Sequence, residues 1–328
     1  MYIETLSKLN ETKFNIWSSF LKKCGLEPDL SVSQTVLLWD DDKLIATGSR
    51  QDNLLKCIAV DELRQGEGHT ATIITALRKE AFSEGYSHLF LYTKPENKTM
   101  FSSLFFYPVA QTDKVLLMEN RKDGIKSFLN ILLEKQSSGI IGSCIMNCNP
   151  FTLGHRYLIE TAAKECDLLY VFVVSEDKSF FSFDDRFQMV ELGTSDIPNV
   201  IVNPTGPYLI SSTTFPTYFL KERERISEIQ CLLDIEIFTK HYVPKFNITR
   251  RYVGTEPLSP MTNQYNKALK EYLPKQGIEV NELSRLELSN TPVSASFVRS
   301  LIEKKDTETI KTLVPKTTFD YLKTKGLI

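Results

Sequence analysis

The feature that most limits the fold of this chain is the alternation of apolar strands with helix-forming segments after residue 140. Ile140–Cys148 and Leu168–Val174 are apolar runs of strand length, and each is followed by a helical pattern, over Gly154–Cys166 and Asp184–Gly193. Such alternation predicts a parallel sheet covered on both faces, with ligands bound at the carboxyl ends of the strands. Further short strands are expected at Val200–Val202, Ile235–Phe238 and Tyr252–Val253.

Residues 1–120 have a different pattern, which predicts a smaller α+β domain. A helical period covers Leu6–Cys24, and two strands flank the acidic turn Asp40-Asp41-Asp42. The strand Cys57–Val60 is followed by the glycine turn Gly66-Glu67-Gly68 and the helix Thr70–Gly85. Further strands are expected at Leu89–Thr93 and Val115–Met118.

The chain length of 328 residues favours two domains, each large enough to bury a core. A helical segment, Gly124–Lys135, leads into the polar break Gln136-Ser137-Ser138-Gly139, which is typical of a linker. We therefore expect one domain over 1–120, a helical linker over 121–139 and a second domain over 140–328.

Charge and cysteine usage exclude several classes of partner. A formal net charge of -2 provides no general attraction to nucleic acid or to an acidic membrane. No apolar run approaches the roughly 18 residues of a membrane-spanning helix, and the start of the chain lacks the pattern of a signal peptide. The six cysteines have neither a CxxC pair nor zinc-like spacing to the four histidines, which favours reduced structural thiols. The expectation is a cytoplasmic protein without nucleic-acid or membrane partners.

A phosphate site is predicted where the first strand of the second domain ends. There Asn149-Pro150-Phe151-Thr152-Leu153-Gly154-His155 opens a helix, and a helix N-terminus has unpaired N–H groups that favour phosphate. Gly154 would let the backbone approach a nucleotide. The imidazole of His155 could donate to a phosphate oxygen as charge moves onto departing pyrophosphate. The alternative is that His155 only caps the helix.

A second candidate phosphate site is Ser294-Ala295-Ser296-Phe297-Val298-Arg299, which follows Pro292 at the start of another helix. The hydroxyls of Ser294 and Ser296 could cap the helix and bind phosphate, and Arg299 has the planar fork that suits phosphate oxygens. A serine-rich cap with a surface arginine is the alternative interpretation.

Together the two motifs resemble the signatures of the nucleotidylyltransferase superfamily, (His/Thr)-x-Gly-His and (Ile/Val)-Ser-x-(Ser/Thr)-x-x-Arg. Here they are Thr152-Leu153-Gly154-His155 and Val293–Arg299, in the order and spacing of one Rossmann-like domain. Phe181–Arg186 resembles the segment after the second strand of adenylyltransferases. That resemblance implies that Arg186 and nearby Lys178 approach phosphates.

Longer stretches resemble the citrate lyase ligase family, namely Gly206–Pro216 and Arg251–Pro257, joined to the Asn147–His155 motif and the N-terminal module. The resemblance covers almost the whole chain. It implies that ATP activates acetate to acetyl-adenylate with release of pyrophosphate. The acetyl group would then pass to the thiol of the prosthetic group on the acyl carrier subunit of citrate lyase.

The expected site residues follow from these motifs. The catalytic groups would be His155, Arg299 and Lys178. The residues expected to bind ATP are Asn149, Pro150, Phe151, Thr152, Gly154, His155, Arg186, Gly254, Glu256, Ser294, Ser296 and Arg299. Mg²⁺ would be held largely by phosphates and water, because no carboxylate cage is apparent in the sequence and no protein metal site is expected.

The N-terminal module resembles the GNAT acetyltransferase fold, mainly through Gly66-Glu67-Gly68 between a strand and a helix. It departs from that family at Leu63, where the usual motif has arginine or glutamine, and at Phe105, which replaces a glycine. The resemblance implies that Gly66 and Gly68 bind the pantetheine arm of the carrier's prosthetic group.

Three other functions remain open from the sequence. One is an adenylyltransferase for a phosphate acceptor, such as phosphopantetheine or nicotinamide mononucleotide. Another is a ligase of the same type that serves malonate decarboxylase. The third is a non-catalytic carrier-binding or regulatory protein with a residual nucleotide pocket, which the presence of both His155 and Arg299 disfavours.

Overall fold

The structure is a computed structural model that describes residues 1–211, 223–256, 259–288 and 291–328. Residues 212–216 of the Gly206–Pro216 stretch, and Pro257, lie outside the described residues. The chain forms two compact units, Met1–Gly124 with Thr213–Glu236, and Ile125–Ser212 with Ile237–Ile328. The domain boundaries expected from the sequence stay a prediction.

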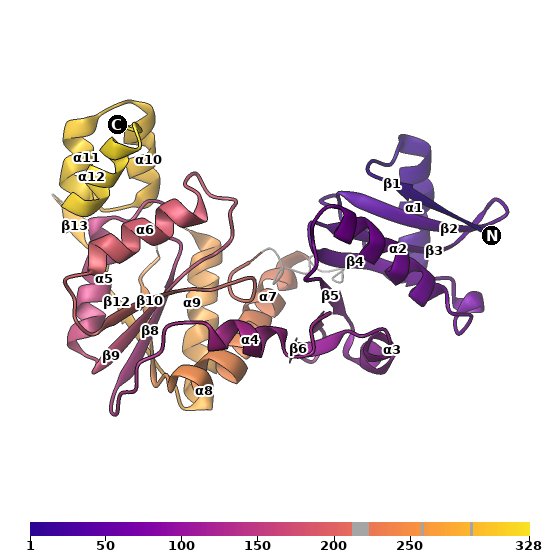
Figure 1. Cartoon of the computed structure of the whole chain (residues 1–328), viewed down its shortest axis with the longest axis horizontal. Helices are drawn as coiled ribbons and strands as arrows, with labels where there is room; N and C mark the ends of the chain where they lie inside the picture. The colour runs from indigo at the N-terminus through magenta and orange to yellow at the C-terminus, as the bar shows by residue number, and fades with distance from the viewer. Residues whose placement is uncertain (212–222, 257–258, 289–290) are drawn as a thin grey trace. The chain divides into compact units, whose positions relative to one another are not determined.

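The second unit is built on a five-stranded sheet in which all neighbours are parallel, with strand order β10-β9-β8-β11-β12 (Figure 1). The predicted Rossmann-like α/β fold is therefore confirmed. The strands are β8 (Ile141–Met146), β9 (Leu168–Val173), β10 (Val200–Pro204), β11 (Arg250–Gly254) and β12 (Glu279–Leu283). A separate pair, β13 (Glu287–Leu288) and β14 (Thr291–Pro292), is antiparallel.

Helices cover both faces of this sheet, because its central strand β9 is apolar and buried at every position. Val171 and Val173 of β9 lie in the core formed with helices α5, α6 and α10 to α12. Tyr170 and Phe172, on the opposite face of β9, contact Phe246. The helices of this unit are α5 (Leu153–Lys164), α6 (Phe183–Thr194), α8 (Val243–Phe246), α9 (Pro260–Tyr272), α10 (Ala295–Glu303), α11 (Thr307–Leu313) and α12 (Lys316–Thr324). Helix α7 (Arg223–Ile237) belongs to the first unit up to Glu236.

The strand order reverses between β8 and β11, since the chain builds outward from β8 to β10 on one side and from β11 to β12 on the other. At such a switch point the connecting helices leave to opposite faces, and a crevice opens beyond the carboxyl ends of the two strands. The motif loop after β8 and the segment after Gly254 therefore meet at this edge.

One strand predicted for this half of the chain is wrong. Ile235–Phe238 was expected to be extended, but it continues α7 and passes into a π-helical stretch, Phe238–Tyr242. Ile229, Leu233 and Ile237 are four residues apart and all buried, which is the spacing of one helix face. This longer helical period determines the structure, and the local β-branched run does not.

The first unit contains a mixed sheet of seven described strands in the order β1-β2-β3-β4-β5-β7-β6. Neighbours are antiparallel except β4 and β5, which pair in parallel only at their starts, Leu54 and Leu55 with Phe90 and Leu91. The strands are β1 (Tyr2–Leu6), β2 (Gln34–Asp40), β3 (Lys43–Gln51), β4 (Leu54–Val60), β5 (Phe90–Thr93), β6 (Tyr107–Gln111) and β7 (Leu116–Glu119).

Helix α2 (His69–Ser83) packs Ile73, Ile74 and Leu77 against one face of this sheet. The unit also contains α1 (Glu11–Lys23), α3 (Lys98–Ser103) and most of α7. The hairpin around Asp40–Asp42 and the strand-turn-helix at the glycines are confirmed. The prediction of a helix from Leu6 is wrong at its start, because Asn10 caps α1 and Tyr2–Leu6 pairs with β2.

The expected helical linker is helical only over α4 (Gly124–Asn130). Beyond it the chain is held by side chains of the parallel sheet. The amide of Asn203 accepts from the Leu133 N–H at 2.9 Å and donates to the Leu133 carbonyl at 2.8 Å. The Lys135 N–H donates to the Tyr170 hydroxyl at 3.1 Å.

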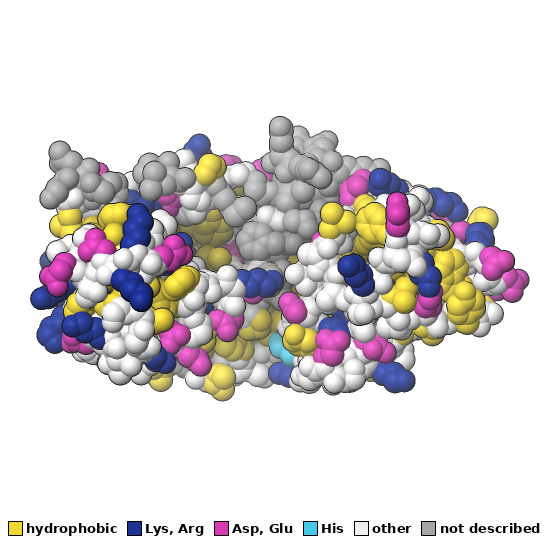
Figure 2. Space-filling model, turned by 90° about the horizontal axis from the view of Figure 1, so that it is seen from above, with side chains coloured by type: hydrophobic (Ala, Val, Ile, Leu, Met, Phe, Trp, Pro, Cys, Tyr) yellow, Lys and Arg dark blue, Asp and Glu magenta, His cyan; other side chains and the backbone are white. Residues whose placement is uncertain are grey.

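None of the described helices has the length and apolar character needed to cross a bilayer. On the face shown in Figure 2, lysine and arginine side chains of the described residues are interspersed with aspartate and glutamate. This distribution agrees with the small formal net charge of -2.

The packing of Gly193 predicts an effect on the motif loop. A Cβ at this position of α6 would lie 2.4 Å from the ring of Phe151, which is fully buried in that loop. Gly193→Ala should therefore lower the free energy of unfolding by about 1–3 kcal/mol, as expected for overpacking. Urea unfolding measures the change, and Glu191→Ala, at an exposed position of the same helix, should alter it by under about 0.5 kcal/mol. A stabilised Gly193→Ala protein would show that helix propensity outweighs the contact.

Candidate functional site

A cavity of about 560 Å³ lies at the carboxyl ends of β8 and β11. Its described walls come from the motif loop and the start of α5, from the residues after β11, from α9, from the segment after β12, and from the start of α10. The two sequence motifs, more than 130 residues apart, therefore face one space. Its volume falls in the range of small-molecule sites.

The start of α5 is fixed by a reciprocal cap between Thr152 and His155. The Thr152 hydroxyl accepts from the His155 N–H at 3.4 Å, and Nδ1 of His155 accepts from the Thr152 N–H at 3.0 Å. Because Nδ1 accepts a hydrogen bond, the neutral ring carries its proton on Nε2. His155 can therefore cap the helix through Nδ1 and donate to a ligand through Nε2, so the two roles predicted as alternatives do not exclude each other.

His155 is held as a neutral imidazole. Burial lowers its pKa to about 4, and the positive charge of Arg285 contributes to the same shift. The ring stacks on Phe151 with centroids 6.0 Å apart. A neutral imidazole with a fixed tautomer offers one N–H donor to the cavity across the physiological pH range.

Gly154 joins the two motifs. A Cβ there would lie 3.2 Å from the carbonyl oxygen of Val293, so the start of the second motif approaches the first helix at the glycine. Both Ser294 and Ser296 line the cavity. The Ser294 hydroxyl caps α10 by accepting from the Phe297 N–H at 3.2 Å and lies 3.2 Å from the Ser296 hydroxyl.

Arg299 is not among the residues that line the cavity. Its Nη1 donates to the Asn149 carbonyl at 2.5 Å, so it connects α10 to the motif loop. The side-chain oxygen of Asn149 accepts from the Phe181 N–H at 3.0 Å. Asn149, Pro150 and Phe151 are all buried and are not among the residues that line the cavity. The structure thus places these residues in the support of the site.

Two cations expected near phosphates also lie away from the cavity wall. Arg186 is fully buried and donates to the Val174 carbonyl at 2.7 Å and to the side-chain oxygen of Asn147 at 2.8 Å, among other oxygens. Lys178 is exposed, with its ammonium 3.8 Å from the Glu176 carboxylate. The structure does not bring either residue to the cavity lining.

Gly254 and Glu256 line the cavity as expected, and sequence reasoning missed several polar neighbours. The amide of Asn266, on α9, donates to the Gly254 carbonyl at 2.9 Å. Arg285, just after β12, forms an ion pair with Glu256. The signal that could have found Arg285 is its place after a strand neighbouring β11, because carboxyl ends of parallel strands share one edge.

The cavity has a protonated thiol in its wall. Burial raises the pKa of the Cys144 thiol, which lines it, to about 12, so the thiol stays protonated. Among the described residues no group of three histidine, cysteine or acidic side chains is arranged to hold a metal ion.

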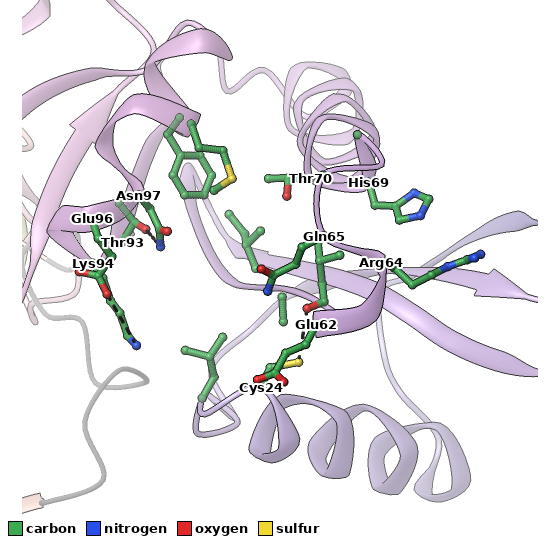
Figure 3. A pocket seen from close by; sticks show the side chains of 18 of the residues that line it. Cys24, Glu62, Arg64, Gln65, His69, Thr70, Thr93, Lys94, Glu96 and Asn97 are labelled. Atoms are coloured by element: carbon green, nitrogen blue, oxygen red, sulfur yellow. Dashed lines mark hydrogen bonds and ion pairs between the residues drawn. The ribbon is translucent and has the colours of Figure 1, made fainter.

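A second cavity, of about 390 Å³, lies within the first unit (Figure 3). It opens where β4 and β5 separate beyond Leu55 and Leu91. In Figure 3, Gln65 points into this space, whereas Arg64 and His69 point away from it. His69 lies 3.1 Å from the Glu67 carboxylate, and this contact places both at the helix start.

The glycine turn forms one wall of this second cavity. Gly66 and Gly68 have φ values of 86° and 83°, and a Cβ on either would meet no atom within 4 Å. Gly68 is the N-cap of α2 and provides no side-chain cap. The unpaired N–H groups of the first turn are thus accessible to an approaching ligand.

The chain matches known proteins over most of its length. A family model for the citrate lyase ligase C-terminal domain matches residues 141–322. Citrate (pro-3S)-lyase ligase of Klebsiella pneumoniae is 41% identical over 309 residues, which are 92% of this chain and 90% of that protein. The same-named protein of Haemophilus influenzae is 36% identical over 336 residues, 99% of each chain.

A solved structure resembles part of the chain at low identity. An acyl-CoA N-acyltransferase from Pseudomonas aeruginosa has 11% sequence identity and covers 37% of this chain and 99% of its own, with a TM-score of 0.32.

The capping geometry predicts the titration of His155. In a ¹³C-detected histidine titration of the protein without nucleotide, the His155 ring should show its Nε2–H tautomer and no protonation step between pH 5.5 and 8, because its pKa is lowered to about 4. His155→Gln identifies the signal. The unfolded chain binds this proton near pH 6.5, so folding stability should fall as the pH drops below that value toward 4. A midpoint near 6.5 in the folded protein would contradict the described environment.

Proposed function

The chain belongs to the citrate lyase ligase family, and we propose from this membership that it activates acetate with ATP and acetylates the carrier of citrate lyase. The acceptor is the thiol of the prosthetic group on the acyl carrier subunit. The products of the full reaction are the acetylated carrier, AMP and pyrophosphate.

The observation that carries this proposal is the extent of the similarity. Relatives of that name align with nearly the full chain, so they cover both the parallel-sheet unit and the first unit. The cavity between the ends of β8 and β11 supports it, because the starts of α5 and α10 line this cavity, and helix N-termini suit an anionic nucleotide.

In the first step an acetate oxygen attacks the α-phosphorus of ATP. A bond forms between that oxygen and phosphorus, the bond to the bridging oxygen breaks, and its electron pair leaves with pyrophosphate. The Nε2–H of His155 donates to a phosphate oxygen and stabilises the growing charge without changing its own protonation. The hydroxyls of Ser294 and Ser296 and the backbone at Gly154 bind phosphate oxygens in the same space.

Arg299 and Lys178 are proposed as further phosphate-binding cations. Arg299 would have to leave the Asn149 carbonyl, and Lys178 the Glu176 carboxylate, to reach a ligand. Mg²⁺ enters as part of the Mg·ATP substrate, coordinated by phosphates and water, because the cavity has no carboxylate cluster among the described residues.

In the second step the carrier thiolate attacks the acetyl carbonyl carbon. A carbon–sulfur bond forms, the bond from carbon to the phosphate oxygen breaks, and AMP leaves with that electron pair. We propose that the cavity of the first unit binds the pantetheine arm. Its walls are the separated strands β4 and β5 and the open turn at Gly66 and Gly68, where amides of the arm can meet backbone groups.

The substrates also indicate where the protein works. ATP, acetate and a reduced carrier thiol are met together in the cytoplasm, and the six free cysteines fit a reducing compartment. We therefore propose a cytoplasmic enzyme whose partner is the acyl carrier subunit.

Acetate activation predicts a specific exchange reaction. Labelled pyrophosphate should enter ATP only when acetate and Mg²⁺ are both present, and without any carrier protein, because acyl-adenylate formation is reversible. Thin-layer or liquid chromatography of the labelled ATP measures the rate. Exchange that needs phosphopantetheine or a mononucleotide in place of acetate would instead identify an adenylyltransferase.

The proposed arm site predicts a separation of the two steps. Gly68→Asn adds a side chain to the wall of the second cavity, and asparagine tolerates the positive φ of 83°. Acetate-dependent exchange should remain near normal, while acetyl transfer to the carrier, followed by mass spectrometry, should fall at least tenfold.

The matched control is Gly85→Asn. Gly85 also has a positive φ, 88°, and an open Cβ direction, but it follows α2 and does not line the cavity. Both steps should survive in this variant. Equal losses in the two variants, or a parallel loss of exchange and transfer in Gly68→Asn, would rule out the arm site.

A further inference from the structure

The cavity between β8 and β11 must accept a polyanion, yet few of its described lining residues carry a charge. Arg285 is the one lysine or arginine among them, and Glu256 is the one acidic residue. The cations expected from the motifs, Arg299, Lys178 and Arg186, are engaged elsewhere. The balance of charge that ATP meets on entry therefore depends on this pair.

Arg285 is held at the end of two neighbouring strands. Its Nε donates to the Thr255 carbonyl at 2.8 Å, and its Nη2 forms an ion pair with Glu256. Glu256 is itself fixed, because its carboxylate accepts from the Ser259 N–H at 3.1 Å. The structure records no hydrogen bond from Nη1 of Arg285 to any described residue, so one edge of the fork remains for a further acceptor.

The pair is partly solvent-accessible, with side-chain exposures of 25% for Arg285 and 12% for Glu256. Arg285 is also close enough to His155 for its charge to contribute to the lowered pKa of that ring. Both residues line the same cavity.

We propose that Arg285 binds a phosphate oxygen of ATP and of the acetyl-adenylate, and that Glu256 positions its guanidinium for that contact. This inference rests on the proposed adenylation reaction and deepens it. A guanidinium suits the task, because two N–H groups remain on the Glu256 side while others meet phosphate. Glu256 would otherwise repel the nucleotide, and its pairing with Arg285 offsets that charge.

The test combines binding, kinetics and titration in four variants of the full chain. Arg285→Gln removes the cation, Arg285→Lys keeps the charge without the fork, and Glu256→Gln keeps the fork without its anchor. Arg250→Gln is the matched control, because Arg250 also has a 25% exposed side chain and pairs with a glutamate, Glu279, but lies at the opposite end of β11 and outside the cavity lining.

In Arg285→Gln the dissociation constant of Mg·ATP, measured by calorimetry, should rise about tenfold to a hundredfold, and KM for ATP should rise with it, whereas KM for acetate should change little. Arg285→Lys should recover part of this loss. Glu256→Gln should lower kcat of the exchange without raising KM for ATP. Arg250→Gln should leave all of these constants unchanged.

The second readout does not depend on activity. Without nucleotide, the pKa of His155 should rise in Arg285→Gln relative to the wild-type protein, and should not change in Arg250→Gln. If the Arg285–Glu256 ion pair had only a structural role, like the Arg250–Glu279 pair, Arg285→Gln and Arg250→Gln would each lower thermal stability. Neither variant would then change ATP affinity selectively.

Unchanged ATP binding in a folded Arg285→Gln protein would overturn the proposal, as would a rise confined to KM for acetate. Failure of the proposed function has a different signature. If the wild-type protein catalyses no acetate-dependent exchange, adenylation of acetate is wrong, while calorimetry with Mg·ATP still decides whether Arg285 binds phosphate.

Discussion

The guanidinium of Arg186 is buried where β8 and β9 end, and it connects the loops that leave these two strands. It donates to the carbonyl and side-chain oxygens of Asn147 and to the carbonyls of Val174, Glu176 and Phe181. The carbonyls of Val174 and Phe181 are buried, and each would cost about 1–3 kcal/mol if left without a donor. One side chain thus sets the position of the loop from which α5 begins, and the direction of the α5 N–H groups follows from it.

The sequence predicted those parts of the site that depend on local chain geometry. A glycine and a histidine at the start of a helix, directly after a buried strand, indicate a phosphate-binding turn, and the structure places Gly154 and His155 at the cavity wall. The same holds for Ser294 and Ser296 at the start of α10. Strand order needed one further rule, that parallel strands expose their carboxyl ends on one edge, and this brought Gly254 and Glu256 to the same place.

Other features depend on contacts that no local pattern specifies. The motif alone cannot show whether an arginine such as Arg299 reaches a ligand or a carbonyl, because both provide oxygen acceptors for the same fork. Arg285 lies in none of the sequence motifs, and it is recognised as a residue of the site only when β11 and β12 are known to be neighbours. The strand Tyr2–Leu6 was missed for the same reason, since its pairing with β2 links segments about thirty residues apart.

An enzyme that makes an acyl-adenylate must protect it from its own nucleophiles. Cys144 lines the cavity, but burial keeps its thiol protonated, and the neutral, hydrogen-bonded ring of His155 has its basic nitrogen occupied by the Thr152 N–H. Neither group can readily attack an activated acetyl carbonyl, because the reactive form of a thiol is the thiolate and a capped Nδ1 has no free lone pair. The acetyl group is therefore retained for a thiol that arrives from outside the cavity. The pantetheine arm that we propose to bind in the first unit would meet that requirement, since it would bring a thiol whose ionisation the adenylating cavity does not suppress.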